Sequence, residues 1–127
     1  MNMFRETLGP TPTAEIIATM LDELSETMGD MAEEMIFELA PMFLEDAPML
    51  MEDLRRAIAS QDATAVQQSA HTLKGSSGSM GIMKLSSLLK DMEAIGRHGN
   101  LEAAGHKMEQ IEAEYEQVRR VLQQYAS

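Results

Sequence analysis

The sequence predicts an all-α protein: an antiparallel bundle of four main helices with additional N-terminal helices packed against it. Three observations support this fold class. Apolar residues recur three and four positions apart over most of the chain, which is the period of a helix with one buried face. Glycine, proline or a capping residue stands near the ends of most of these stretches. Aromatic residues make up only 4% of the chain, and abundant alanine, leucine and methionine suit close helix packing.

Length and composition limit the classes of function. A chain of 127 residues is long enough for one core, and we expect a flexible arm at residues 1–12 and a single domain at residues 13–127. The formal net charge of −11 argues against nucleic acid or an anionic membrane as the main partner. Cysteine, a long apolar run and an apolar signal core are all absent from the sequence, so we expect a soluble cytoplasmic protein.

The first helix is expected from Thr13, a good N-cap, to about Met28, before Gly29 ends it. Its apolar stripe consists of Ile17, Met20, Leu21 and Leu24. Asp30 and Glu33 have the spacing of a capping box, which predicts a second helix over residues 31–45.

Two prolines lie in the region that follows. Pro41 falls inside the apolar stripe of the second helix, so we expect a kink or break at residues 37–40. Pro48 then suits the first turn of a third helix, which would run to about Ser60.

A fourth helix, from Asp62 to about Ser79, contains the candidate functional residues. Asp62 can cap its start, and Gly81 closes its end. His71 lies about 100° on the helical wheel from the nearest edge of the expected core face, and Gln67, Gln68, Lys74, Gly75 and Gly78 share its side. That core face spans about 80° and consists of Val66, Ala70, Leu73, Ser77 and Met80. The ring of His71 is therefore expected to face solvent.

Lys74 and Gly75 follow His71 by three and four positions, so both lie one turn further along the same helix. Glycine inside a helix costs roughly 0.5–1 kcal/mol relative to alanine, and Gly75 and Gly78 suggest that another surface approaches the backbone here. An accessible histidine beside a cation suits a nucleophile that carries a phosphoryl group. A solvated surface histidine near tolerated glycines is the alternative.

These residues resemble the signature of histidine-containing phosphotransfer (HPt) domains, the phosphorelay carriers of two-component signalling. The resemblance rests on His71-Thr72-Leu73-Lys74-Gly75-Ser76-Ser77-Gly78-Ser79-Met80-Gly81 and extends roughly from the second helix to the C-terminus. It implies that His71 is phosphorylated, that Lys74 assists and that Gly75 leaves room for the partner. The implied partners are response-regulator receiver domains and a sensor or hybrid histidine kinase. No cofactor of its own is implied, and Mg²⁺ is expected on the receiver domain.

The fifth helix, residues 82–97, has an apolar face and a polar ridge. The apolar face consists of Ile82, Leu85, Leu88, Leu89, Met92 and Ile95, and the ridge of Ser86, Lys90, Glu93 and Arg97. If this helix packs antiparallel beside the fourth, the ridge borders His71. Glu93 falls where the resemblance places a polar residue, commonly glutamine, that orients the imidazole. Because an ionised glutamate repels a bound phosphate, an ordinary ion pair with Lys90 or Arg97 is the alternative role for Glu93.

Residues 96–100 are expected to form a turn, with Asn100 as the cap of a last helix over residues 100–125. Its narrow apolar seam consists of Leu101, Ala104, Met108, Ile111, Tyr115, Val118, Leu122 and Tyr125. The same pattern could serve a coiled-coil dimer, but the short turns elsewhere favour a monomeric bundle.

Other candidate sites are weaker. His98 lies in the expected turn and His106 opposite the seam, so both are interpreted as solvated. Glu102 and His106 offer two metal ligands without a third, so no metal site is predicted. Most of the 13 methionines fall on apolar stripes and are interpreted as core filling. The sequence contains no ATP-binding loop and no dinucleotide fingerprint.

Charge is unevenly distributed. Residues 71–98 carry four basic and two acidic side chains, whereas residues 1–70 carry 14 acidic and 3 basic ones. An acidic pocket on a partner would be steered toward the positive segment, although chance clustering of four cations is the alternative.

We therefore predict a phosphorelay intermediate without ATP-dependent kinase activity of its own. As the resemblance implies, His71 would accept a phosphoryl group from the aspartyl phosphate of one receiver domain and pass it to another. Two alternatives remain: a helical docking or scaffold module that uses the small-residue face without chemistry, and a histidine domain excised from a larger hybrid or chemotaxis-type kinase. The initiating methionine and the well-formed last helix favour a free-standing protein.

Overall fold

The computed structural model describes residues 12–126, which form five α-helices and two short 3-10 helices. The α-helices are α2 (Pro12–Met28), α3 (Ala32–Ala59), α4 (Ala63–Ser79), α5 (Met83–His98) and α6 (Ala104–Ala126), and η1 (Gly29–Met31) and η2 (Leu101–Ala103) precede α3 and α6. The described residues contain no strand, so the predicted all-α class is confirmed. The arm predicted at residues 1–12 lies outside the described residues, apart from Pro12 at the start of α2.

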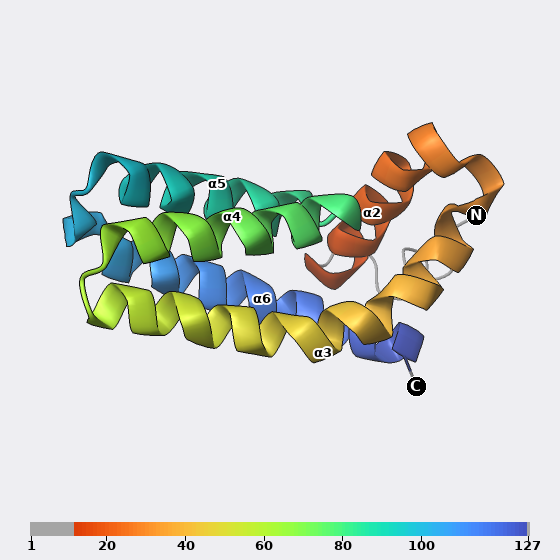
Figure 1. Ribbon diagram of the computed structural model, residues 1–127. Coiled ribbons are helices and arrows are strands. Elements are labelled where there is room, and N and C mark those ends of the chain that lie inside the picture. The colour runs from red at the N-terminus through yellow and green to blue at the C-terminus, as the bar shows by residue number, and fades with distance from the viewer. Residues whose placement is uncertain (1–11, 127) are drawn as a thin grey trace.

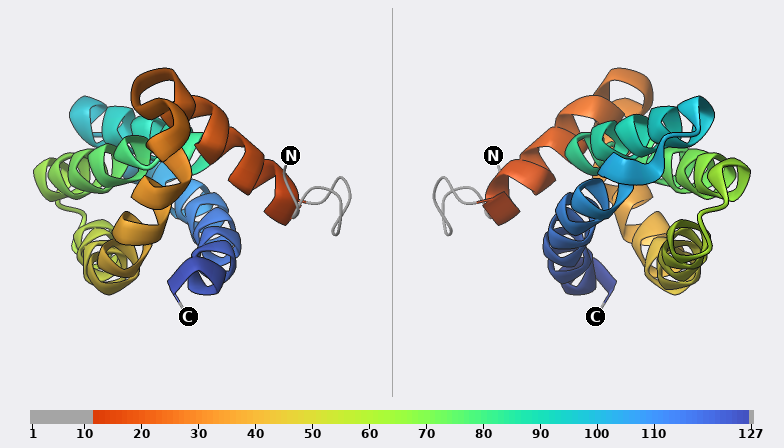
Figure 2. Two further views of the ribbon diagram at one scale, coloured as in Figure 1. Left: turned by 90° about the vertical axis from the view of Figure 1, so that its right-hand side faces the viewer. Right: turned by 90° about the vertical axis from the view of Figure 1, so that its left-hand side faces the viewer.

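Helices α3, α4, α5 and α6 form an antiparallel four-helix bundle (Figures 1 and 2). Short connections reverse the chain after α3, α4 and α5, so that neighbours in the sequence are also neighbours in space. Helix α2 crosses one end of the bundle and packs against α3 and α6. Met20 and Leu24 from its predicted stripe are buried, whereas the side chain of Ile17 lies outside the described residues.

Helix α3 contradicts the prediction of two helices separated at the prolines. It is continuous from Ala32 to Ala59 with Pro41 and Pro48 inside it, although it changes direction along its length (Figure 1). Both prolines lie on the exposed face, so their rings do not disturb the core. The buried stripe continues past them at helical spacing and consists of Ala32, Ile36, Ala40, Phe43, Ala47, Met51, Leu54 and Ala57. Packing of this stripe keeps the two segments in one helix.

The predicted capping box at Asp30 is also wrong. Asp30 lies within η1, and Met31 occupies the N-cap position of α3 without a side-chain hydrogen bond. Gly29 adopts a positive φ of +58°, which turns the chain directly from α2 into η1. The turn therefore depends on the glycine and not on the aspartate.

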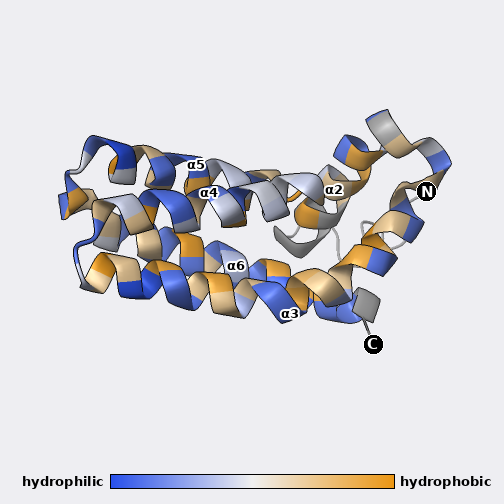
Figure 3. Ribbon diagram, in the orientation of Figure 1, coloured by the Kyte–Doolittle hydropathy of each residue, from blue (hydrophilic) through white to orange (hydrophobic). Residues whose placement is uncertain are grey.

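One face of each bundle helix builds the core, and Figure 3 shows the alternation of hydrophobic and hydrophilic residues along the helices. The seam of α6 is buried inside the chain through Ala104, Met108, Ile111, Tyr115, Val118 and Leu122. Because this seam packs against its own bundle, it is not free to form a coiled-coil dimer. The side chain of Tyr125 lies outside the described residues.

The interpretation of the methionines as core filling needs correction. Five of those in the described residues are buried, namely Met20, Met51, Met80, Met92 and Met108. Four large exposed side chains are also methionines: Met31, Met42, Met49 and Met83. Met42 and Met49 lie on α3 outside its buried stripe, Met31 lies in η1 and Met83 begins α5, so these four are not part of the core.

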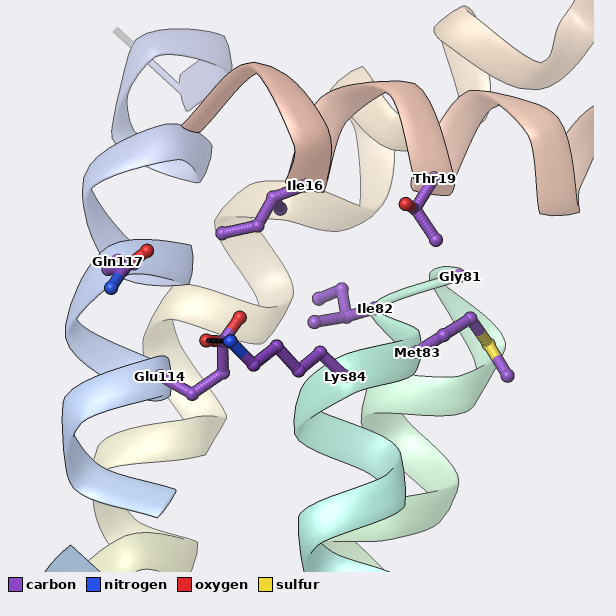
Figure 4. A pocket seen from close by; sticks show the side chains of 8 residues that line it. All are labelled: Ile16, Thr19, Gly81, Ile82, Met83, Lys84, Glu114 and Gln117. Atoms are coloured by element: carbon purple, nitrogen blue, oxygen red, sulfur yellow. Dashed lines mark ion pairs between the residues drawn. The ribbon is translucent and has the colours of Figure 1, made fainter. Parts of the chain in front are cut away.

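Helix α2 closes a pocket against the start of α5 and the middle of α6 (Figure 4). The carboxylate of Glu114 lies on the wall of this pocket, 3.5 Å from the ammonium of Lys84. Gly81 contacts α2 closely, because a Cβ on it would lie 3.1 Å from the backbone of Met20. Helix α2 thus covers this end of the bundle. The pocket is formed mainly by α2, α5 and α6, whereas His71 lies on α4.

Candidate functional site

Helix α4 displays His71 as the sequence predicts. The Asp62 carboxylate accepts a hydrogen bond of 3.1 Å from the backbone N–H of Ala65, which confirms Asp62 as the N-cap. The five residues of the expected core face, Val66, Ala70, Leu73, Ser77 and Met80, are all buried. On the other side of the helix, the His71 side chain is 67% exposed.

The close approach of α5 to α4 places a second side chain beside the ring. Gly81 has a φ of +74° and reverses the chain after α4, as predicted. Gly96 was predicted in a turn, but it is buried inside α5, which continues to His98. A Cβ on Gly96 would lie only 2.6 Å from the backbone nitrogen of Gln67, so glycine is needed for the two helices to pack this closely. Glu93, one turn earlier on α5, consequently reaches His71.

Glu93 connects the side chains of the site. Its Oε2 lies 2.8 Å from Nδ1 of His71, and its Oε1 accepts a hydrogen bond of 2.6 Å from Nζ of Lys74. Arg97 is further away, with 3.7 Å between its guanidinium and Oε2. The Glu93 side chain is only 8% exposed. The alternative role, an ion pair with Lys90 or Arg97, therefore describes only part of what Glu93 contacts. Arg97 is one of three partners of Glu93, and exposed Lys90 forms none of the ion pairs found among the described residues.

The surroundings of Glu93 favour its ionised form. The hydrogen bond from Lys74 is the largest cause that lowers the pKa of Glu93, and the contact with His71 acts in the same direction. Burial opposes them but does not reverse the shift. Because an ionised carboxylate only accepts hydrogen bonds, the proton of a neutral His71 ring belongs on Nδ1. The lone pair of Nε2 is then free on the exposed edge of the ring.

Small residues keep the space around the ring open. A Cβ on Gly75 would meet no atom within 4 Å, and one on Gly78 would meet only the Ser86 hydroxyl, at 3.5 Å. That hydroxyl donates a hydrogen bond of 3.3 Å to the backbone carbonyl of Lys74, and so links the two helices beside the site. Neither glycine is therefore explained by close packing within this chain.

A shallow depression surrounds His71 and brings together several predicted site residues. It is lined by Thr64, Gln67, Gln68, His71, Thr72 and Glu93. Thr72 and the Lys74–Glu93 pair were not predicted. The pair joins residues 19 positions apart on two helices, so its detection requires the helix register and not a sequence motif.

A groove between α3 and α4 lies on the other side of the histidine helix. Leu39, Met42, Phe43, Asp46, Ala47 and Leu50 form its α3 wall, and Ser76, Ser79 and Met80 its α4 wall. Ser79 is eight residues beyond His71 on α4, or about 12 Å along the axis at 1.5 Å per residue.

The other two histidines lie apart from this site. His98 is the last residue of α5, where its Nδ1 lies 2.7 Å from the backbone carbonyl of Ala94, and His106 is exposed on α6. Within the described range, no three or more histidine, aspartate or glutamate side chains are grouped so that they could hold a metal ion.

Comparisons with known proteins agree with the geometry. The family profile of the Hpt domain matches residues 38–121, which include α4, α5 and most of α3 and α6. The chain belongs to this family of histidine phosphotransfer domains.

Among solved structures, the fold is similar to the crystal structure of histidine-containing phosphotransfer protein B (HptB) from Pseudomonas aeruginosa PAO1. The TM-score is 0.69 and the sequence identity 32%, over 83% of this chain and 88% of that one. A search of curated proteins gave no significant match.

Membership confirms the resemblance seen in the sequence. Proteins of this family take part in histidine phosphotransfer in two-component signalling, and they exchange phosphoryl groups with receiver domains and kinases as carriers. No helix in residues 12–126 is long and apolar enough to cross a membrane.

Proposed function

We propose that this chain is a phosphorelay intermediate in which Nε2 of His71 accepts a phosphoryl group from the aspartyl phosphate of a receiver domain and passes it to another receiver. The observation that supports this most strongly is the contact of 2.8 Å between Glu93 and Nδ1 on a side chain that is 67% exposed, because it leaves Nε2 as the ring nitrogen available for attack. A sensor or hybrid histidine kinase would supply the relay. The chain itself acts as a carrier and uses no ATP.

The chemistry of one transfer balances at the ring. The Nε2 lone pair attacks phosphorus, the N–P bond forms, and the P–O bond to the receiver aspartate breaks as that carboxylate leaves. The product ring bears the phosphoryl group on Nε2 and still holds a proton on Nδ1, so it is cationic. The carboxylate of Glu93 stabilises that cation, while its hydrogen bond keeps the ring in the attacking orientation.

Lys74 and the partner would each neutralise part of the negative charge of the phosphoryl group. The Lys74 ammonium donates one hydrogen bond to Glu93 and has two further N–H groups for phosphoryl oxygens. Mg²⁺ on the receiver would neutralise the remaining charge in the transition state. This chain needs no metal of its own for the step.

The docking face would be centred on His71 and cover the exposed side of α4. Gly75 and Gly78 allow the partner close to the helix backbone, while Gln67 and Gln68 offer side-chain amides next to the ring. Lys90 and Arg97 lie exposed on α5 and would attract the acidic pocket of a receiver.

The test is to mix the purified protein with a panel of phosphorylated receiver domains and Mg²⁺ and to measure protein-bound phosphate that is labile in acid and stable in base. Label on the wild type and none on a folded His71→Gln variant is the expected result. Full labelling of His71→Gln would overturn the proposal. Binding of receivers without label on the wild type would instead favour a docking module without chemistry.

A further inference from the structure

Helices α4 and α5 lie side by side (Figure 1) and come into backbone contact at Gly96, which is buried on α5. A Cβ at position 96 would lie 2.6 Å from the backbone nitrogen of Gln67 and 2.9 Å from the backbone oxygen of Ala63. These two atoms are the donor and acceptor positions of one turn of α4. They cannot rotate aside as the end of a flexible side chain can, so a side chain at position 96 would push the two helices apart.

Glu93 reaches the histidine from the same face of α5. It lies three residues before Gly96, or about 4.5 Å along the helix axis. The α4 residues that these two approach, His71 and Gln67, are four residues apart in the opposite direction along the chain. Residues three or four positions apart share one face of a helix. The backbone contact at Gly96 and the carboxylate contact at His71 are therefore neighbouring points of one α4–α5 interface.

The carboxylate contact tolerates little displacement. The Cβ of Gly96→Ala would have to move from 2.6 Å to the 3.4 Å at which ordinary contacts begin, a displacement of about 0.8 Å. Carried along the helix to Glu93, that displacement lengthens the contact of 2.8 Å with Nδ1 to about 3.6 Å, which is beyond hydrogen-bond range. The hydrogen bond that keeps the ring proton on Nδ1 would then be lost.

We propose that Gly96 is a positioning residue for phosphotransfer, because it sets the α4–α5 spacing at which Glu93 holds the ring proton of His71 on Nδ1 and leaves Nε2 free. The inference rests on the proposed function. Gly96 is buried against backbone atoms at the start of α4, so it acts through Glu93 and not by contact with a partner. Since the His71 side chain is 67% exposed, the hydrogen bond to Glu93 decides which ring nitrogen carries the proton.

The experiment compares the wild type with Gly96→Ala in 15N–1H correlation spectra of the histidine rings. Spectra are recorded at about pH 8.5, roughly two units above the ordinary pKa of imidazole, and the signals of His71 are those that disappear in His71→Gln. The wild type should show a protonated Nδ1 and a bare Nε2, whereas Gly96→Ala should show a mixture of the two tautomers.

Transfer kinetics provide the second measurement. Rapid-quench transfer from a phosphorylated receiver to Gly96→Ala should have a maximal rate at least about tenfold below that of the wild type, because the nucleophilic nitrogen is no longer held ready. The Kd of the receiver should be unchanged, because the exposed side of α4 is unaltered. A general loss of structure would instead weaken receiver binding.

Gly99→Ala is the matched control on the same helix. Gly99 is the C-cap of α5 with a φ of +79°, and a Cβ there meets no atom within 4 Å. Alanine is strained in this left-handed conformation, so the variant should lower the melting temperature without pushing α5 away from α4. Its tautomer and its maximal transfer rate should match those of the wild type. A loss of stability alone therefore does not imitate the effect expected of Gly96→Ala.

Glu93→Asp keeps the test decisive if circular dichroism shows that Gly96→Ala is unfolded. This variant withdraws the carboxylate by one methylene group and leaves the contact at Gly96 intact, so it should also give mixed tautomers and slower transfer. The inference is overturned by a folded Gly96→Ala protein that keeps either the wild-type tautomer or the wild-type maximal rate. It is equally overturned by a Glu93→Asp protein in which both are unchanged.

Failure of the proposed function looks different, because then the wild type would take up no phosphate from any receiver. The comparison of tautomers would still show whether Gly96 positions Glu93 against His71.

Discussion

Replacement of Gly75 by alanine should have opposite effects on two properties: the stability of α4 and the access of a partner to His71. The added methyl group would meet no atom of this chain within 4 Å. Alanine is favoured over glycine inside a helix by roughly 0.5–1 kcal/mol. We therefore expect Gly75→Ala to raise the free energy of unfolding by that amount and the melting temperature by about 2–5 °C.

Phosphotransfer should change in the opposite direction. If a receiver packs against the backbone at Gly75, the methyl group separates the aspartyl phosphate from Nε2. A displacement of about 1 Å at reacting groups can lower a rate on the order of 100-fold. We expect a fall of at least about tenfold in kcat/KM for transfer from a phosphorylated receiver, measured by rapid quench with limiting receiver.

Gly105 provides the matched control. It is exposed in the first turn of α6, and a Cβ there also meets no atom within 4 Å. Gly105→Ala should not reduce stability and should leave transfer unchanged. A Gly75→Ala protein that is stabilised and still transfers at the wild-type rate would refute the idea that Gly75 serves partner access. A destabilised Gly75→Ala protein would show that the space beside it is already occupied.

Three further predictions concern stability. Because the pKa of Glu93 is lowered from its ordinary value of 4.5, its ionised form stabilises the fold at pH values above 4.5. This stabilisation is lost as the pH falls through the pKa of the folded state. Urea unfolding from pH 7 to pH 3 should therefore show a steeper loss for the wild type than for Glu93→Gln; parallel curves would contradict this. Gly96→Ala should cost about 1–3 kcal/mol in thermal melts because its Cβ would overlap α5 with the Gln67 backbone, and an unchanged melting temperature would show that the helices can separate freely. Tyr115→Phe removes a buried hydroxyl that has no hydrogen-bond partner in the described part of the chain. It should leave the free energy of unfolding unchanged or raise it by up to about 1 kcal/mol, and a clear loss of stability would point to a partner for that hydroxyl.

The sequence predicted α4 well because its signals are local. Asp62 caps the helix, the buried stripe follows at helical spacing, and Gly81 closes the end. Each of these features acts within one or two turns, so no knowledge of the other helices is needed. The outward position of His71 followed directly from that register.

The errors arose where one residue type has two structural uses. Pro41 was expected to kink or break a helix and Pro48 to begin a new one, yet both face solvent within one helix whose other side is packed. Glycine was interpreted as a turn at Gly96, where it instead permits contact between α4 and α5. In both cases tertiary packing decides between the uses. A single sequence without the arrangement of its helices does not contain that information.

The same limit applies to Glu93, whose partners on α4 could not be assigned from spacing. On the proposed mechanism, its negative charge also affects how tightly the phosphoryl group is held. With a neutral His71, the charges of Lys74, Arg97 and Glu93 leave the free site with an excess of one positive charge. A phosphoryl group adds about two negative charges at neutral pH. The cationic ring offsets one of them, and Glu93 already occupies part of the hydrogen-bonding capacity of Lys74.

Once the donor receiver and its Mg²⁺ depart, Lys74, Arg97 and the cationic ring only just balance the charges of the phosphoryl group and Glu93, and no positive charge is in excess. Glutamine at position 93 would accept a hydrogen bond from Nδ1 without adding a negative charge, so it would hold the phosphoryl group more firmly. Glutamate sacrifices some of that stability and keeps the group ready to leave for the next receiver. On the proposed mechanism, the carboxylate that orients His71 would thus also limit how tightly the phosphorylated ring is held, as a carrier between two receivers would require.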